Sequence, residues 1–137
     1  MKLTDIQIAQ KLTAKYANAL KRGIHFNLSF KRMKQLCKQK TCFFTGIKFH
    51  EYIKPLEPGE TEHPYAMTID RIDSSLGYTD DNVVACTNEF NKLKSNLSLQ
   101  TIERMYKGVQ KVIERNKEKE QKTGKEQLRP VVLRKAV

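Results

Sequence analysis

Residues 68–96, TIDRIDSSLGYTDDNVVACTNEFNKLKSN, constrain the fold more than any other part of the chain. Their first part alternates in polarity like a strand, and residues 82–86 form a short apolar run that suits a second strand. A polar, turn-rich loop separates the two runs. Thr87 or Asn88 can cap a helix that carries Asn91. This order of strand, polar loop, strand and helix predicts a hairpin that packs on the helix following it.

Capping residues and apolar spacing predict three further helices. Thr4-Asp5 can cap a first helix that ends near residue 21, and Ser29 can cap a second, shorter one. A last helix is predicted from Ser98 onward, because apolar residues recur there at helical spacing. We therefore expect an α+β fold in which a ββα core is flanked by N- and C-terminal helices.

The chain is long enough for one domain. With 137 residues, 39% of them hydrophobic, it can bury one modest core but not two. We expect a single domain over residues 1–116, with its core at about 42–96. Residues 117–137 are charged and have no apolar stripe, so we expect a basic, flexible tail there.

Charge is distributed unevenly along the chain. Residues 1–41 contain ten lysines and arginines against one acid, residues 99–137 eleven against five, and residues 42–98 five against nine. Basic flanks favour a polyanion such as DNA, because each neutralised phosphate releases condensed counterions. The acidic centre would repel DNA unless a divalent cation offsets its charge. The alternative is that the lysine-rich helices are only solvated surfaces.

Neither a membrane nor an export route is indicated. The chain has no run of about 18 apolar residues, and its N-terminus lacks the apolar block and cleavage site of a signal peptide. We expect a cytoplasmic protein. The odd number of cysteines favours free thiols over a disulfide framework.

Two side chains with hard oxygen atoms should meet where the hairpin packs on its helix. Asp70 ends the first predicted strand, and Asn91 lies in the helix. Carboxylate and amide oxygens suit Mg²⁺ or Mn²⁺, with water and a substrate phosphate completing the coordination. Spacing alone leaves capping open as the alternative role of both residues.

Two segments, TCFFTGIKF and the hairpin–helix stretch described above, resemble an HNH endonuclease of the ββα-metal class, especially its small phage-encoded members. The resemblance covers about residues 15–96, because KYANALKRGIHFNLSFKRMKQL is similar to the segment that precedes the site in such proteins. It implies a metal-dependent DNA endonuclease or nickase that hydrolyses phosphodiester bonds. If the chain is phage-encoded, its compartment is the cytoplasm of the host cell.

The resemblance also implies a role for each matching residue. Asp70 and Asn91 match the family's ligands for a divalent metal, Mg²⁺ or Mn²⁺. Asn82 matches the asparagine that braces the loop by bonding backbone groups, and Gly77 should supply a turn conformation that a side chain would disfavour. The expected contacts to nucleic acid are Arg71, Lys92 and Lys94. For the two lysines, a solvated helix surface is the alternative.

One position departs from the family's pattern in a way that affects the chemistry. A histidine usually follows the metal-binding Asp and acts as the general base on water, but this chain has Arg71. Arginine stays protonated, so it would clamp a phosphate or stabilise charge in the transition state. Water would then be activated by Asp73, by His63 or by the metal ion itself. The alternatives are an Asx-turn or a pair with Arg71 for Asp73, and a surface loop position for His63.

A second departure concerns the structural zinc of many HNH proteins. Cys42 and Cys86 fall near the ligand positions, but four ligands are not available. We expect no structural zinc, with apolar packing by Phe43, Phe44 and Phe90 in its place. The cysteines should then be buried core residues.

Two functions remain open from the sequence. The first is a metal-dependent endonuclease or nickase, favoured by the presence of Asp70, Asn82 and Asn91 together. The second is an HNH-like DNA-binding module with weakened cleavage, favoured by Arg71 at the position of the general base.

Overall fold

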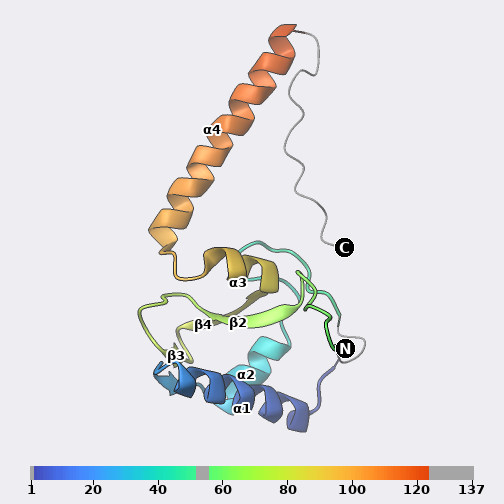
Figure 1. Cartoon of the computed structure of the whole chain (residues 1–137), viewed down its shortest axis with the longest axis vertical. Coiled ribbons are helices and arrows are strands. Elements are labelled where there is room, and N and C mark those ends of the chain that lie inside the picture. The colour runs from blue at the N-terminus through green and yellow to red at the C-terminus, as the bar shows by residue number, and fades with distance from the viewer. Residues whose placement is uncertain (1, 52–55, 124–137) are drawn as a thin grey trace. The chain divides into compact units, whose positions relative to one another are not determined.

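The structure is a computed structural model that describes residues 2–51 and 56–123. Contacts divide the chain into two units, Met1–Asn96 and Leu97–Val137, and each is described by itself. Within the described residues the fold is mixed α+β, with four helices and two small two-stranded sheets (Figure 1). The expected α+β class is confirmed.

The first unit holds all the strands of the described chain. Its elements, in chain order, are α1 (Asp5–Lys21), β1 (Phe26–Asn27), α2 (Phe30–Cys37), β2 (Met67–Arg71), β3 (Tyr78–Thr79), β4 (Val83–Thr87) and α3 (Asn88–Lys94).

Helices α1, α2 and α3 begin at the caps that the sequence predicts. Thr4 accepts a hydrogen bond from the Gln7 N–H, and the Gln7 side chain accepts one from the Thr4 N–H, which completes a capping box. The side chains of Ser29 and Thr87 cap α2 and α3, each by accepting one hydrogen bond from a backbone N–H three residues later. These helix starts are therefore decided by bonds within one turn of the chain.

The predicted hairpin is formed by β2 and β4. The two strands are antiparallel, with a register that runs from Met67↔Thr87 to Arg71↔Val83. Figure 1 shows α3 over one side of this hairpin and α1 with α2 on the other. Asp70 therefore lies near the end of β2, in a strand that is covered by helices.

Two long-range links that the sequence did not indicate join the N-terminal part to the hairpin loop. Strand β1 pairs in parallel with β3, in the register Phe26↔Tyr78. The carboxylate of Asp80 accepts hydrogen bonds from the backbone N–H and the hydroxyl of Ser29, at 2.8 and 2.7 Å. The loop after β2 is thus attached to α1 and α2 through their connecting segment.

The core of the first unit lies between the helices and the hairpin. It combines side chains from α1 and α2 with others from the strands, and its buried members are Ile8, Ala19, Leu28, Met33, Leu36, Ile69, Tyr78, Val83 and Ala85. Because Tyr78 and Ile69 belong to this core, the strands next to the candidate site are held by hydrophobic burial.

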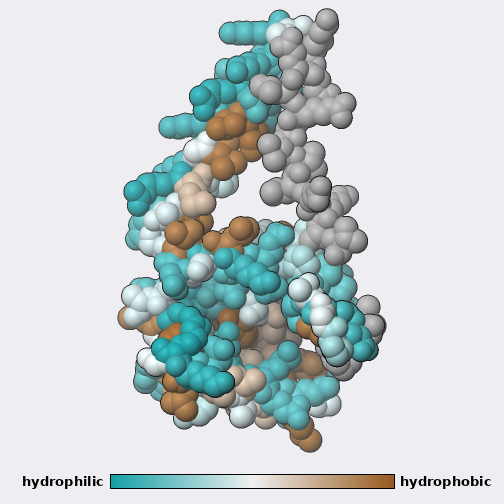
Figure 2. Space-filling view, in the orientation of Figure 1, coloured by the Kyte–Doolittle hydropathy of each residue, from teal (hydrophilic) through white to brown (hydrophobic). Residues whose placement is uncertain are grey.

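The second unit contains one long helix, α4 (Leu99–Thr123). The helix continues beyond residue 116, so residues 117–123 of the expected tail are helical, and residues 124–137 lie outside the described part. None of its residues is buried, and Figure 2 shows hydrophobic side chains exposed between charged ones along it. Among the described residues, no helix is long and apolar enough to cross a membrane.

Candidate functional site

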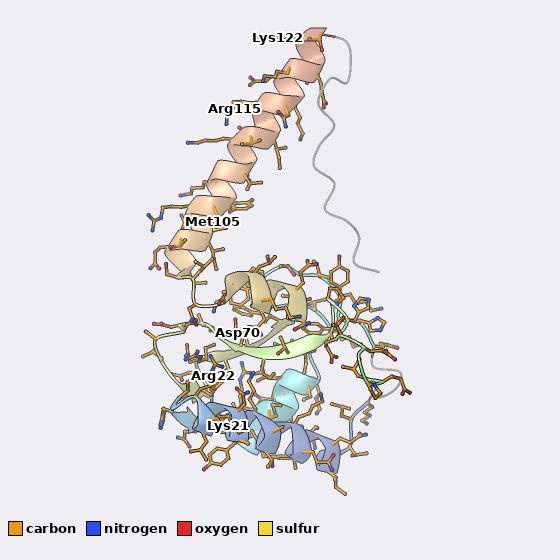
Figure 3. All side chains as sticks on the ribbon, viewed as in Figure 1. Lys21, Arg22, Asp70, Met105, Arg115 and Lys122 are labelled. Carbon is orange, nitrogen blue, oxygen red and sulfur yellow. The ribbon has the colours of Figure 1, made fainter. Side chains whose placement is uncertain are left out.

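Asp70 and Asn91 line the same cavity, which has a volume of about 360 Å³. The two residues expected to converge therefore lie on the wall of one cavity. Figure 3 shows Asp70 on β2 and Arg22 at the end of α1. Arg22 lines the same cavity as Asp70. The complete lining is Lys15, Arg22, Ile69, Asp70, Arg71, Tyr78, Asn91, Lys92, Ser95 and Asn96. A larger cavity of about 520 Å³, near α2 and β4, contains none of the predicted site residues.

The carboxylate of Asp70 is buried, with 7% of the residue exposed. Its Oδ1 accepts a hydrogen bond from the Arg71 N–H at 2.8 Å. Its Oδ2 lies 3.1 Å from the Lys94 ammonium but outside hydrogen-bonding geometry, so this oxygen has an ion-pair partner and no hydrogen bond. One carboxylate oxygen thus remains able to accept a further bond.

Lys94 is buried, contrary to the expectation that it contacts nucleic acid or solvent. It is 1% exposed, and besides its ion pair with Asp70 it donates to the Arg71 carbonyl at 3.0 Å and to the Ser74 hydroxyl at 3.2 Å. A lysine with these internal partners is neither a phosphate contact nor a solvated helix residue. Lys92, two residues earlier, is exposed and lines the cavity.

Arg71 lines the cavity and at the same time holds the loop that follows β2. Its Nη1 donates to the carbonyls of Ser74 and Leu76, at 2.8 and 2.9 Å. The guanidinium carbon lies 5.2 Å from the centre of the Tyr78 ring, at cation–π distance. The buried Nε has no hydrogen-bond partner in the described part of the chain. A contact with a phosphate would therefore have to use the N–H groups of Nη2 or Nε, because Nη1 is already bonded to two carbonyls.

Asn82 braces the loop, as the resemblance implied. Its Oδ1 accepts from the Asp73 N–H at 3.0 Å, and its Nδ2 donates to the carbonyls of Asp73 and Gly77 at 3.1 and 2.9 Å. All three partners are backbone groups of the segment between β2 and β3. The side chain is outside the lining of the cavity, so its contribution is to position the loop.

The reason expected for Gly77 is wrong. The glycines with positive φ in the described residues are Gly23, Gly46 and Gly59, so Gly77 does not supply a left-handed turn. A Cβ built on Gly77 would instead lie 2.5 Å from the carbonyl oxygen of His25. The glycine is needed because the backbone at the start of β3 approaches the segment before β1 closely.

Asp73 forms the Asx-turn that was the alternative to a general base. Its Oδ1 accepts from the N–H and the hydroxyl of Ser75, at 2.9 and 2.6 Å. These two bonds lower the pKa of the Asp73 carboxyl, which makes it a weaker base. The residue is exposed and does not line the cavity, so the structure does not bring it to Asp70 and Asn91.

His63 is likewise away from the cavity. Its Nδ1 accepts a hydrogen bond from the Tyr65 N–H at 2.9 Å, and its ring stacks on His50 at 3.8 Å between centroids. Burial lowers the pKa of His63, and the neighbouring His50 lowers it further. The neutral imidazole therefore has a local structural role in the segment that leads into β2.

The acidic excess of residues 42–98 does not lie at the cavity. Asp70 is the one acidic residue in the lining, against four basic ones.

Two of the basic residues, Lys15 and Arg22, belong to or adjoin α1 and were not predicted. Their spacing of seven residues, two turns of one helix face, is a signal that the sequence did contain.

The three cysteines were expected to be buried core residues that hold no zinc. Cys42 and Cys86 are buried and Cys37 is half-buried, all as free thiols. Burial, and then the nearby Asp70, raises the pKa of Cys86 to about 12. Burial alone would raise the pKa of Cys42, but hydrogen bonds from Thr45, Thr87 and Phe44 outweigh it and lower that pKa.

The three phenylalanines expected to pack near the cysteines contact one another, although Phe43 is 62% exposed. The ring of Phe44 stacks on Phe90 at 4.6 Å and meets Phe43 edge-on at 5.2 Å. No group of three or more His, Cys, Asp and Glu converges within residues 2–51 and 56–123. The absence of a structural zinc stays a prediction.

The donors at the cavity fit a hard divalent cation. Asp70 carries a carboxylate whose Oδ2 has no hydrogen bond and is buried beside Lys94, and Asn91 of the facing helix lines the same cavity with an amide side chain. Two protein oxygens leave most of the coordination sphere to water and phosphate, as is usual for Mg²⁺.

Comparison with known proteins leaves the family open. The chain is 30% identical over 105 residues to an uncharacterized 29.0 kDa protein of Enterobacteria phage T4, from the dda-modA intergenic region. The match covers 74% of this chain and 39% of that protein, so the chain spans well under half of its relative's length. No family model matches the chain. No solved structure matches it either.

Proposed function

We propose that the chain is a metal-dependent DNA endonuclease or nickase of the HNH, ββα-metal type. The observation that carries this proposal is the convergence of Asp70 and Asn91 on one cavity whose other charged residues are basic. A carboxylate and an amide oxygen for a divalent cation, together with cations for a phosphate, are the groups that phosphodiester hydrolysis needs.

Each residue of the cavity has a distinct part in this proposal. Asp70 and Asn91 would hold Mg²⁺ or Mn²⁺, which lowers the pKa of a bound water molecule and stabilises charge on the phosphate. Lys94 orients the Asp70 carboxylate from behind, and Asn82 and Arg71 hold the loop that follows it. Lys92, exposed at the rim, contacts the substrate phosphate.

No side chain of the cavity is suited to act as a general base. Among the described lining residues none is a histidine, and Arg71 stays protonated. Asp73 and His63 are outside the lining, the first in a turn and the second bonded to the backbone. Activation of water would then be supplied by the divalent cation that Asp70 and Asn91 would hold, the third of the candidates that the sequence left open.

A DNA-binding module with weakened cleavage is the second candidate. Two observations favour it. Arg71 already donates two hydrogen bonds to backbone carbonyls, and the carboxylate of Asp70 already forms an ion pair with the Lys94 ammonium. In this alternative the Asp70–Lys94 pair is purely structural, and the basic surface alone binds DNA.

Nicking of supercoiled plasmid separates the two candidates. We expect the wild-type protein to nick plasmid with Mg²⁺ or Mn²⁺ and to stop when a chelator is added. Asn91→Ala should lower the rate at least about 100-fold, because a metal ligand is lost, while DNA binding is retained. Asn88→Ala, on the same helix but outside the cavity lining, is the matched control and should keep the activity.

Asp70→Asn and Arg71→His complete the test. Asp70→Asn should also abolish nicking, and its folding must be checked because it alters a buried ion pair. An Arg71→His protein that is much faster than a feeble wild type would favour the weakened module. Equal rates for Asn91→Ala and Asn88→Ala would rule out the proposed metal site.

A further inference from the structure

The basic side chains of the cavity come from helices on two sides of the hairpin. Lys15 lies in α1, Arg22 is the C-terminal cap of α1, and Lys92 lies in α3. None of the ion pairs found among the described residues involves any of the three. Their charges are therefore not neutralised by a carboxylate within the described part of the protein.

The net charge of the cavity favours an anion over a lone cation. Lys15, Arg22, Arg71 and Lys92 contribute four positive charges, Asp70 one negative charge, and the difference is a formal +3. The Lys94 ammonium, 3.1 Å behind the Asp70 carboxylate, adds to the repulsion that a divalent cation would meet there. A phosphodiester group brings negative charge and oxygen ligands, and both reduce that repulsion.

The cations of Lys15 and Arg71 are held against one aromatic ring before any ligand binds. The Lys15 ammonium lies 5.2 Å from the centre of the buried Tyr78 ring, whose π-electrons also face the Arg71 guanidinium. Arg22 is exposed, and only its backbone N–H is held, by the carbonyls of residues 18–20. Fixed cations bind a phosphate with less loss of side-chain entropy than free ones.

A further observation points to a ligand in the same place. Arg71 is 7% exposed, and its Nε has no hydrogen-bond partner among the described residues. The Oδ2 of Asp70 also lacks a hydrogen bond. Two residues of the cavity lining therefore carry buried polar atoms whose hydrogen-bonding capacity the described residues leave unused.

We infer that Lys15 and Arg22 form the phosphate-binding side of the cavity, and that Asp70 and Asn91 hold the divalent cation only together with a backbone phosphate of DNA. In this order the cavity binds the DNA phosphate before it binds the divalent cation. This inference rests on the proposed function and adds to it an order of binding and two residues outside the ββα core.

Binding of Mn²⁺, followed by the electron paramagnetic resonance signal of the free ion, tests this order without relying on activity. The full-length protein is titrated alone and with saturating duplex DNA, and the Mn²⁺ bound by DNA alone is subtracted. We expect the affinity for Mn²⁺ to rise at least about tenfold with DNA. Asn91→Ala should abolish this gain, because it removes a ligand.

A pair of matched double variants tests the two α1 residues. Lys15→Gln/Arg22→Gln removes both cations from the cavity, whereas Lys11→Gln/Lys21→Gln removes the same charge from the same helix outside the cavity lining. At saturating DNA, the first variant should lose the DNA-dependent Mn²⁺ affinity and the second should keep it. Equal losses in both would overturn the assignment of Lys15 and Arg22.

The remaining outcomes distinguish this inference from the proposed function. Mn²⁺ that binds equally well with and without DNA, in a protein that still nicks plasmid, would overturn the order of binding and leave the endonuclease proposal standing. Absence of protein-bound Mn²⁺ in both states, with no nicking, would overturn both.

Discussion

The hairpin region, residues 67–94, and helix α4 contain similar charged residues in opposite environments. In the hairpin region Asp70, Arg71 and Lys94 are each at most 7% exposed and bonded to one another or to the backbone. In α4 no residue is buried, and its Glu103–Lys107 ion pair has side chains more than 60% exposed. Lysine and acid content therefore says little about the role of a segment until the packing around it is known.

The same contrast holds for the energetic consequences of a charge. A buried ion pair loses much stability when one partner is removed, because the other charge stays unpaired away from water. An exposed pair contributes little, because water and salt screen it. Substitutions made in parallel in the two regions can therefore test the environments that the structure assigns to them.

The largest effect is expected for Lys94→Met. It would leave the Asp70 carboxylate buried without its ammonium partner and the Arg71 carbonyl without a donor, at a cost of about 3–5 kcal/mol in the free energy of unfolding. Lys107→Met in α4 should stay within about 0.5 kcal/mol of the wild type. Urea denaturation followed by circular dichroism measures both, and a similar small loss in each would contradict the buried pair.

A smaller effect, opposite in sign between the regions, is expected for two glycines. Gly77→Ala would place a Cβ 2.5 Å from the His25 carbonyl oxygen and should cost about 1–3 kcal/mol. Gly108→Ala, in α4, meets nothing within 4 Å and should stabilise the helix by up to about 1 kcal/mol. Thermal melts of the two variants check the signs, and a stabilised Gly77→Ala protein would rule out the close approach.

The smallest effect concerns the pH dependence of stability through Asp80. The hydrogen bonds from the Ser29 N–H and hydroxyl hold the pKa of the Asp80 carboxyl below its ordinary value. A lowered pKa in the folded state stabilises the protein above the unfolded-state pKa, near 3.9, and this contribution is lost as the pH falls through the lowered value.

Asp80→Asn should therefore lower the melting temperature by about 2 °C at pH 7, because solvent screens this exposed carboxylate and limits its contribution to a few tenths of a kcal/mol. The difference from the wild type should shrink below about pH 4, as the wild-type carboxyl becomes protonated. Glu103→Gln in α4 serves as the exposed control. A difference between Asp80→Asn and wild type that is the same at pH 3 and pH 7 would argue against a charged Asp80 as the acceptor.

Much of the secondary structure was predictable because its signals are local. The caps Thr4, Ser29 and Thr87 each bond a backbone N–H three residues later, so residue type and spacing identify the helix starts. The alternation around Asp70 and the apolar run that follows Asn82 predicted the hairpin. From that hairpin and its helix, the convergence of Asp70 and Asn91 on one cavity followed.

The charges of the site were less predictable, because their environments depend on distant parts of the chain. Lys92 and Lys94 are two residues apart on α3, yet one is exposed and the other fully buried. Lys94 is buried because its ammonium reaches Asp70, Arg71 and Ser74, at least 20 residues earlier. These contacts cannot be predicted from the amino-acid composition of α3 alone.

The sequence by itself determined the helices, the hairpin strands, their order and the candidate metal pair, because capping, periodicity and motif spacing act over a few residues. Only the tertiary structure decided which charges face the cavity. It placed Lys15 and Arg22 beside Asp70, turned Lys94 inward and left Asp73 in a turn at the surface. The physical reason is that burial and ion pairing are set by which helices cover the hairpin, and the covering helix α1 lies more than 45 residues before β2.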